Sequence, residues 1–299
     1  MIISLHTTVL LKESIDGLNI KKSDVYLDGT LGGGGHFLLA LERGAKLAIG
    51  LDRDEMALAR VRAKIEDANF SKYVLMNEDF RMMDKVVVSL GLEKVDKILL
   101  DLGLSSDQLD MSGRGFTFQK DEPLLMTFKK NPGPNDLTAE KIVNTWDEEN
   151  IADIIYGWGE ENFSRKIAKA IVSERAKKPI NTTFELKEII SKAVPGFARH
   201  GRIHPATKTF QALRITVNDE IRALEEALEK GFALLNSSGR MGIISFHSLE
   251  DRRVKNFYRN KSDEGLGKLI TKKPIVPEDG ERLVNPRSRS AKLRIIEKI

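Results

Sequence analysis

Five glycines within seven residues, between positions 29 and 35, place the strongest constraint on this chain. The apolar run 25–27 precedes them and ends in Asp28, and the apolar-periodic stretch 37–41 follows them. The first run is typical of a β-strand and the second of a helix. Glycines in such a strand-to-helix turn let a ligand approach the backbone where a Cβ would clash. The segment therefore predicts a nucleotide-type cofactor site, with a merely flexible turn as the alternative.

A second apolar run, residues 47–51, ends in Asp52. The carboxylate stands about 20 residues after the glycines, the spacing of one that binds ribose hydroxyls. Helix capping is the alternative for Asp52 and for Asp54, because residues 55–65 have a helical pattern. The dinucleotide fingerprint G-x-G-x-x-G fails, since Phe37 stands where its last glycine should be. The residues from Asp28 to Gly34 instead resemble the first motif of class I S-adenosylmethionine-dependent methyltransferases.

The first 103 residues alternate between strand and helix patterns. Further strands are expected at 73–76 and 98–100, and helices at 55–68 and 82–90. This alternation is typical of a doubly wound parallel sheet, whose ligand crevice lies at the carboxyl ends of its strands. Four acidic residues lie at or just after those ends: Asp28, Asp52, Asp79 and Asp101. Each could cap a helix by itself, but four together indicate a site.

The pattern changes after the fourth strand, because residues 105–203 contain no convincing strand and several helical runs. The sheet pattern then resumes with a long helix over 205–235 and a strand over 241–246. It continues with a helix over 248–259, where Ser248 and Asp251 have capping-box spacing, and with strands at 269–270 and 293–296. We expect an α/β fold, a class I (Rossmann-like) seven-stranded methyltransferase sheet. Residues 1–104 and 206–299 would form it, and 105–205 an inserted all-helical domain.

Composition excludes several kinds of site. The chain has no cysteine, which excludes cysteine-ligated metals and a thiol nucleophile, and no metal is expected. Residues 1–6 lack a signal-peptide pattern, and no run of about 18 apolar residues exists, so we expect a cytoplasmic protein without a membrane partner. Residues 252–299 hold 14 Lys/Arg against 6 Asp/Glu, on a body of net charge −4. This asymmetry favours an anionic partner such as nucleic acid, although an ordinary solvated surface is the alternative.

Longer motifs occur in order along nearly the whole chain. They are HTTVLL (6–11), DGTLGGGGH (28–36), DLGLSSDQL (101–109), RGFTF (114–118), HPATKTFQALR (204–214), SFHSLEDR (245–252) and NPRSRSAKLR (285–294). Together they resemble the bacterial RsmH (MraW) family, which is far more specific than the glycine turn alone. The resemblance implies an S-adenosylmethionine-dependent methyltransferase acting on cytosine N4 of small-subunit (16S) ribosomal RNA near the decoding centre.

The resemblance also implies roles for individual residues. Gly34, Gly35 and His36 would line the amino-acid end of S-adenosylmethionine, and Asp52 would bind its ribose. Phe80, after Asp79, would lie against the adenine, and Asp101 and Gln108 would complete the pocket. The alternatives are a first-turn helix residue for His36 and a core aromatic for Phe80. His247 and Ser248 are interpreted as helix entry and capping.

Asp101 is the candidate catalytic residue. Methyltransferases of exocyclic base amines place Asp or Asn followed by Pro-Pro-aromatic at the fourth strand end. Here the acid is kept, but Leu102-Gly103 follows it. Asp101 could therefore contact the amine or only the cofactor, and the proton acceptor stays open.

Candidate RNA contacts lie in two basic segments and one aromatic loop. Phe116 and Phe118, beside Arg114, would hold an extruded base, with packing against the inserted domain as the alternative. Phosphate contacts are expected from Arg199, Arg202, His204, Arg287 and Arg289.

Three other functions fit parts of the pattern. A DNA amino-methyltransferase conflicts with the fourth-strand motif, and a nicotinamide-dependent oxidoreductase conflicts with the missing third glycine. A non-catalytic RNA-binding assembly factor with a vestigial pocket is the remaining alternative. The sequence leaves open the oligomeric state and whether free RNA or the assembled small subunit is the substrate.

Overall fold

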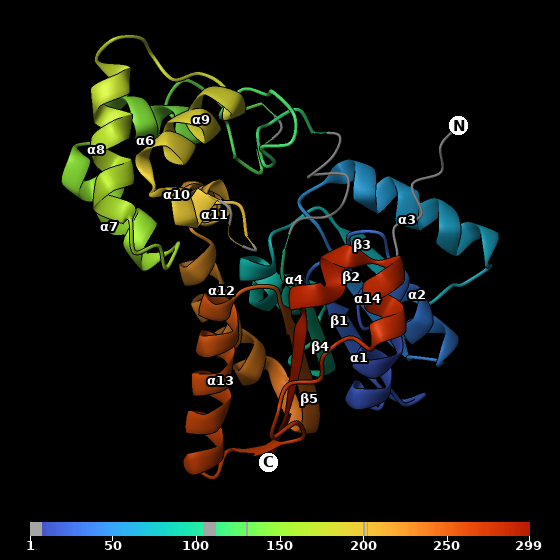
Figure 1. Cartoon of the computed structure of the whole chain (residues 1–299). Helices are drawn as coiled ribbons and strands as arrows, with labels where there is room; N and C mark the ends of the chain where they lie inside the picture. Colours follow the sequence, from blue (N-terminus) through green and yellow to red (C-terminus); the bar gives the residue numbers. More distant parts are fainter. Residues whose placement is uncertain (1–7, 104–111, 130, 200, 202) are drawn as a thin grey trace. The chain divides into compact units, whose positions relative to one another are not determined.

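A computed structural model describes residues 8–103, 112–129, 131–199, 201 and 203–299. The chain divides into two compact units, of which one combines residues 1–105 with 223–299 and the other spans 106–222 (Figure 1). The first unit holds the sheet, and the second is helical. No helix in these described stretches has the length and apolar character needed to cross a bilayer.

A single seven-stranded sheet organises the first unit. Its strands are β1 (Val25–Asp28), β2 (Leu47–Leu51), β3 (Tyr73–Met76), β4 (Val95–Asp101), β5 (Leu235–Ser245), β6 (Gly267–Leu269) and β7 (Lys292–Lys298). Their order is β3-β2-β1-β4-β5-β7-β6. The first five in this order pair in parallel, whereas β7 runs antiparallel to both β5 and β6. The predicted α/β fold with two C-terminal strands is confirmed.

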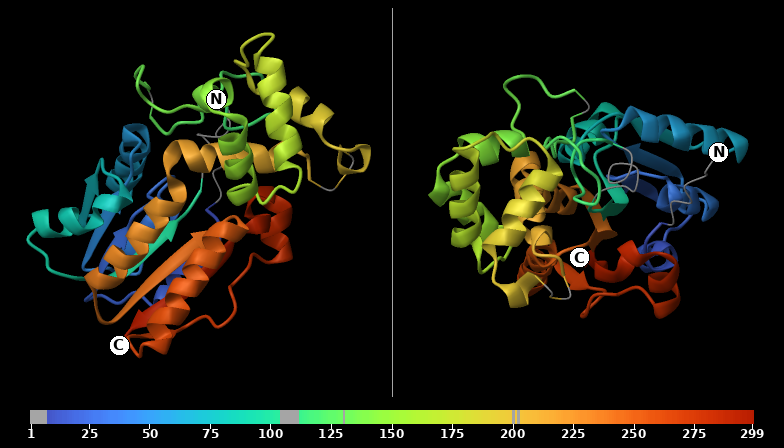
Figure 2. Two further views of the ribbon diagram at one scale, coloured as in Figure 1. Left: turned by 90° about the vertical axis from the view of Figure 1, so that its left-hand side faces the viewer. Right: turned by 45° about the horizontal axis from the view of Figure 1, so that its top comes forward.

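Helices cover both faces of the sheet (Figure 2). One layer comprises α1 (Leu11–Leu18), α2 (Gly35–Glu42) and α3 (Glu55–Asp67), and the other comprises α4 (Met83–Ser89), α12 (Glu220–Leu234) and α13 (Ser248–Asp263). Alternate residues of β1 explain why both layers are needed, because Tyr26 packs into the first and Leu27 into the second. Three short elements complete the unit: η1 (Phe80–Met82), α14 (Asp279–Val284) and η2 (Pro286–Ser290).

The second unit is built from α6 (Ala139–Thr145), α7 (Glu148–Gly157), α8 (Ser164–Arg175), α9 (Thr183–Ala193), α10 (Gly196–Arg199) and α11 (Ala206–Asn218). The single helix expected over 205–235 is wrong, since α11 ends at Asn218 and α12 begins at Glu220. Asp219 between them has φ +52°, a left-handed conformation that Asp tolerates better than most residues. The Asn218 side chain fixes this break by accepting from Phe128 N at 2.8 Å and donating to the Met126 carbonyl at 2.7 Å.

The second domain boundary therefore differs from the sequence-based one. The expected insert ended at 205, but α11 packs against α6, α7 and α9 and belongs to the helical unit. Phe210 and Leu213 of α11 are buried. Sequence periodicity shows that this helix has an apolar face, but not which unit that face packs against.

Candidate functional site

Packing and backbone hydrogen bonds fix the glycine turn between β1 and α2. Gly34 has φ +79°, and its N–H donates to the Leu31 carbonyl at 2.8 Å. A Cβ at Gly34 would lie 2.6 Å from Val61 Cγ2, and one at Gly35 would lie 2.0 Å from Thr8 Oγ1. Glycine is needed here for a left-handed residue and for two close approaches. Such packing does not fit the alternative of a merely flexible turn.

Asp52 ties the end of β2 to this turn. Its Oδ2 accepts from Gly32 N at 2.8 Å, and its Oδ1 accepts from Asp54 N at 2.9 Å. Burial raises the pKa of the Asp52 carboxyl, and the two amide donors oppose that rise. The cap of α3 is Asp54, which accepts from Met56 N at 2.9 Å. Asp52 thus holds a carboxylate beside the glycines, and helix capping belongs to its neighbour.

Asp28 is buried at the end of β1, with only 1% of its surface exposed. It accepts from the Tyr26 hydroxyl at 3.0 Å and from Thr30 N at 3.2 Å. The Thr30 hydroxyl in turn accepts from Asp101 N at 2.6 Å, which links the ends of β1 and β4. Burial raises the pKa of Asp28 to about 7, and the charge of Asp52 adds to this rise against the opposing hydrogen bonds.

Asp101, the candidate catalytic residue, lies where several carboxyl groups converge. Its Oδ2 is 4.0 Å from Nδ1 of the buried His36. Its Oδ1 is shielded from solvent and has no hydrogen-bond partner among the described residues. Burial raises the pKa of Asp101 well above its ordinary value, and the charges of Asp28, Glu250 and Glu281 raise it further. Asp101 therefore holds its proton far more tightly than an exposed Asp, unless a positive charge is nearby.

Asp79 and Phe80 follow β3. The Asp79 carboxylate accepts from Arg81 N at 2.9 Å, which caps η1, and forms an ion pair with Arg53. Phe80 is half-buried and packs against the hydrophobic cluster on the α4 side of the sheet. Its Cβ would lie 3.1 Å from a Cβ added to Gly29. Phe80 thus borders the glycine turn and also serves as a core aromatic.

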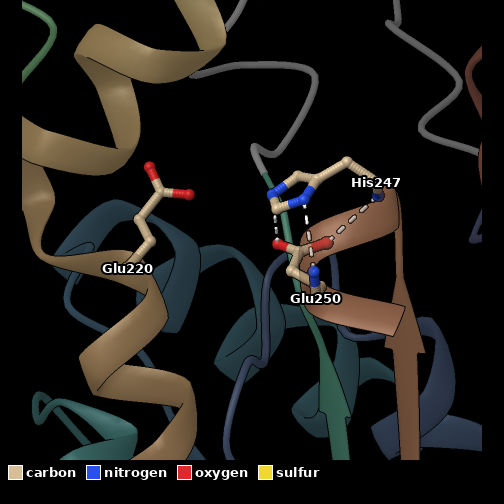
Figure 3. A group of neighbouring side chains, drawn as sticks. All are labelled: Glu220, His247 and Glu250. Carbon is tan, nitrogen blue, oxygen red and sulfur yellow. Dashed lines mark hydrogen bonds and ion pairs between the residues drawn. The ribbon is translucent and has the colours of Figure 1, made fainter. Parts of the chain in front are cut away.

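His247 and Glu250 form a capping pair at the start of α13. His247 is the N-cap, which confirms its interpretation as a capping residue. Figure 3 shows the His247 ring against the Glu250 carboxylate, with His247 Nε2 3.1 Å from Glu250 Oε1. Glu250 N donates to His247 Nδ1 at 3.3 Å, and Glu250 Oε2 accepts from Phe246 N at 2.8 Å. The expected pair of Ser248 and Asp251 is wrong by one residue. His-x-x-Glu has capping-box spacing, but His is not among the preferred caps.

The basic C-terminal segment uses part of its charge internally. Arg294 is 8% exposed, and its Nε donates to Asp251 Oδ1 at 2.7 Å. Lys292 Nζ lies 3.2 Å from the other oxygen of Asp251. Arg287 and Arg289, both in η2, are exposed. Arg287 and Arg289 keep exposed surface, whereas Arg294 holds β7 against α13.

The aromatic loop lies in the helical unit. Nη1 of Arg114 donates to the carbonyl oxygens of residues 127–129, and its guanidinium lies 5.4 Å from the ring centre of Phe116. Phe116 is 8% exposed and stacks on Phe128 with ring centres 5.7 Å apart. This arrangement favours the packing alternative for Arg114 and Phe116. Phe118 is half-buried against His204, with ring centres 4.9 Å apart, and keeps part of its surface exposed.

The remaining predicted contacts have mixed positions. Arg199 donates to two carbonyl oxygens at the end of α9, each at 3.1 Å. Burial and the charge of Lys187 lower the pKa of His204, which favours its neutral ring. Gln108 and Arg202 lie outside the described residues.

These features suit a ligand that carries hydroxyl groups and positive charge. Carboxylates of Asp28, Asp52 and Asp101 surround the glycine turn, and carboxylate oxygens accept hydrogen bonds from hydroxyl and ammonium groups. A cation beside them would favour their ionised forms, which burial disfavours. Val61 packs closely against Gly34 and Thr8 against Gly35, so the backbone of this turn is held in place by its neighbours.

Comparison with known proteins gives consistent relatives. Two proteins named ribosomal RNA small subunit methyltransferase H, from Brevibacillus brevis and Clostridium botulinum, are each 44% identical to this chain. The first aligns over 312 residues, 98% of each chain, and the second over 313 residues, 98% of this chain and 99% of the relative. An rRNA methylase structure from Streptococcus thermophilus has 13% identity and a TM-score of 0.46, over 96% of this chain and 95% of that one.

Agreement extends to the family level. The family model described as the MraW methylase family matches residues 3–299, which include every strand of the sheet and the whole helical unit. The glycine turn and the strand-end carboxylates all fall inside that match. The chain therefore belongs to the MraW methylase family.

Proposed function

We propose that this protein transfers the methyl group of S-adenosylmethionine to the exocyclic N4 of a cytosine in 16S ribosomal RNA, near the decoding centre. The observation that carries the proposal is the 44% identity to small-subunit rRNA methyltransferases over 98% of this chain. The sheet unit adds a glycine turn bordered by carboxylates at three strand ends, a setting that fits this cofactor. The cytosine and its position come from the family resemblance.

S-adenosylmethionine supplies a methyl group that its sulfonium charge already activates. The chain therefore has to bind, align and exclude water rather than activate a donor. Asp52 accepts one hydrogen bond on each oxygen from the amides of Gly32 and Asp54. Its remaining lone pairs would accept hydrogen bonds from the ribose hydroxyls. Gly34, Gly35 and His36 would border the amino-acid end, Asp79 and Phe80 the adenine end, and Gln108 would complete the pocket.

Asp101 would hold the acceptor amine. Its Oδ1, which has no hydrogen-bond partner among the described residues, can accept a hydrogen bond from an N4–H. That bond would turn the nitrogen lone pair away from the ring. Burial raises the pKa of Asp101 in the chain alone, and the cofactor's positive charge would favour the ionised form, in which both oxygens accept. Because the cation and the acceptor act on the same carboxyl, Asp101 is expected to depend on the cofactor for its role.

RNA would be bound by residues of both units. In the sheet unit, the exposed Arg287 and Arg289 are suited to phosphates. In the helical unit, Phe118 and His204 form an aromatic pair with exposed surface, and Arg199 and Arg202 lie in the same basic segment. The small ribosomal subunit is the proposed context, which puts the reaction in the cytoplasm.

Mass-spectrometric mapping of small-subunit rRNA tests this function directly. Cells that lack the gene should lose one N4-methyl group on a cytosine, and purified protein with S-adenosylmethionine should restore it on their subunits. The Asp101→Asn variant should bind the cofactor but restore the group slowly. An unchanged modification pattern in the deletion strain would refute the proposal, and cofactor-free binding to RNA would then favour the assembly-factor alternative.

A further inference from the structure

The short helix α14 reaches back to the start of the chain through one side chain. Leu10, the residue before α1, has a left-handed backbone with φ +51° and no side-chain cap of its own. Its N–H donates to Oε1 of Glu281, on α14, at 3.0 Å, and the two residues are 271 positions apart. Leu10 itself is fully buried. Glu281 therefore satisfies a backbone donor that has lost contact with water.

That donor lies close to the glycine turn along the chain. Thr8 is two residues before Leu10, and its hydroxyl lies 2.0 Å from where a Cβ of Gly35 would be. Val9 and Leu10 pack with Leu293 of β7 in one hydrophobic cluster. Residues 8–10 therefore join two contacts: Thr8 lies against Gly35 at the start of α2, and Leu10 is hydrogen-bonded to Glu281 of α14.

Glu281 also acts on the site through its charge. It is one of the carboxylates that raise the pKa of Asp101, after burial and the charges of Asp28 and Glu250. A single side chain on α14 thus affects both the backbone beside the glycine turn and the ionisation of the candidate catalytic carboxyl.

The segment formed by α14 and η2 also exposes apolar and basic side chains. Leu283 and Val284 are 79% and 78% exposed, which is unusual for adjacent apolar residues on a helix. Arg287 and Arg289 follow in η2 and are also exposed. Apolar side chains flanked by arginines match a polyanion that offers base or sugar surface, so this segment fits the RNA of the proposed function.

We infer that Glu281 is a positioning residue that couples RNA binding on the segment 279–290 to cofactor binding at the glycine turn. The inference rests on the proposed function. RNA held by the exposed residues of α14 and η2 would stabilise the Glu281–Leu10 hydrogen bond, which in turn keeps Thr8 against Gly35. By linkage, a bound cofactor would favour RNA binding to the same extent.

Three variants of the full chain test this coupling. Glu281→Ala removes the acceptor, and Glu281→Gln keeps an acceptor oxygen without the charge. As a control, Glu278→Gln removes a charge from the exposed residue that immediately precedes α14. The Kd for S-adenosylmethionine is measured by calorimetry with and without a saturating 16S rRNA fragment. Thermal unfolding of each variant is measured in parallel.

We expect Glu281→Ala to weaken cofactor binding about tenfold, the effect of leaving one buried donor unpaired, and to abolish its enhancement by RNA. Glu281→Gln should keep both within about twofold but shift the pH profile of methylation to lower pH, because one charge opposing ionisation of Asp101 is gone. Glu278→Gln should match wild type in all three. Equal RNA enhancement in Glu281→Ala and wild type, or none in wild type, would overturn the coupling. Wild type that neither binds cofactor nor methylates rRNA would instead refute the proposed function.

Discussion

Replacing Asp28 by Asn should change how the stability of the protein depends on pH. Asp28 is buried, and its pKa is raised from 3.8 to about 7 in the folded chain. A raised carboxyl pKa means that the folded state binds the proton more tightly than the unfolded state. The contribution of Asp28 to stability is therefore fully present below its unfolded pKa and is lost as pH rises toward 7. Asn has a similar shape, can accept from Thr30 N and does not titrate.

The size of the effect follows from the folded and unfolded pKa values of Asp28. A tenfold change in proton affinity corresponds to about 1.4 kcal/mol, so raising the pKa from 3.8 to about 7 removes roughly 4 kcal/mol over the whole titration. Between pH 5 and pH 8 the loss is about 2 to 3 kcal/mol, because part of the unfolded-state titration is already complete at pH 5. The raised pKa of Asp101 has the same sign. Burial, its largest cause, persists in the variant, whereas the contribution from the charge of Asp28 is lost.

Urea unfolding at pH 5, 6.5 and 8 measures this directly for wild type and Asp28→Asn. The free energy of unfolding of the variant, relative to wild type, should increase by about 2 to 3 kcal/mol from pH 5 to pH 8. Asp67→Asn, a change at an exposed carboxyl at the end of α3, is the matched control and should run parallel to wild type. Parallel curves for Asp28→Asn and wild type would refute the assignment of a proton to Asp28.

Three further outcomes are expected. Affinity for S-adenosylmethionine, measured by calorimetry, should rise from pH 6 to pH 8 as Asp28 ionises. The affinity for S-adenosylhomocysteine, which lacks the sulfonium charge, should rise less over the same range. An affinity for S-adenosylmethionine that falls would contradict this prediction. Gly34→Ala should lower cofactor affinity at least tenfold, since its Cβ would lie 2.6 Å from Val61 Cγ2 at φ +79°, and unchanged binding would show that the turn can shift. Arg294→Ala should lower the unfolding free energy by about 1.5 to 3 kcal/mol, because Asp251 would lose its hydrogen bonds to the guanidinium and, among the described residues, keep only Lys292. A loss below about 1 kcal/mol would rank this pair with exposed ones.

Local patterns in the sequence predicted the sheet unit well. Strand-end acids such as Asp52 and Asp101 could be placed because parallel strands end at one edge of a sheet. The glycine turn could be placed because φ > 0 and close approach leave glycine few substitutes. Both features depend on short stretches of chain, which is why a single sequence sufficed for them.

Features that depend on distant residues could not be predicted. The break at Asp219 is fixed by Asn218 hydrogen bonds to backbone about 90 residues away, and nothing in the helical periodicity marks it. For Phe116 the sequence left base contact and packing both open, and only the structure shows its ring stacked on Phe128 inside the helical unit. Glu281 carries no local signal of a site residue, because its partner Leu10 is 271 positions away. Each required knowing which segments pack together.

The strand-end acids also explain why this site opposes folding and yet suits its ligand. Burial raises the pKa of both Asp28 and Asp101, and the charges of Asp28, Glu250 and Glu281 raise that of Asp101 further. Hydrophobic residues there would make the sheet edge more stable. The carboxyl groups of Asp28, Asp101, Glu250 and Glu281 instead favour the binding of a positively charged ligand beside Asp101. A sulfonium cofactor satisfies this requirement, whereas its neutral-sulfur product satisfies less of it, so the same charges that oppose folding would favour exchange of product for fresh cofactor.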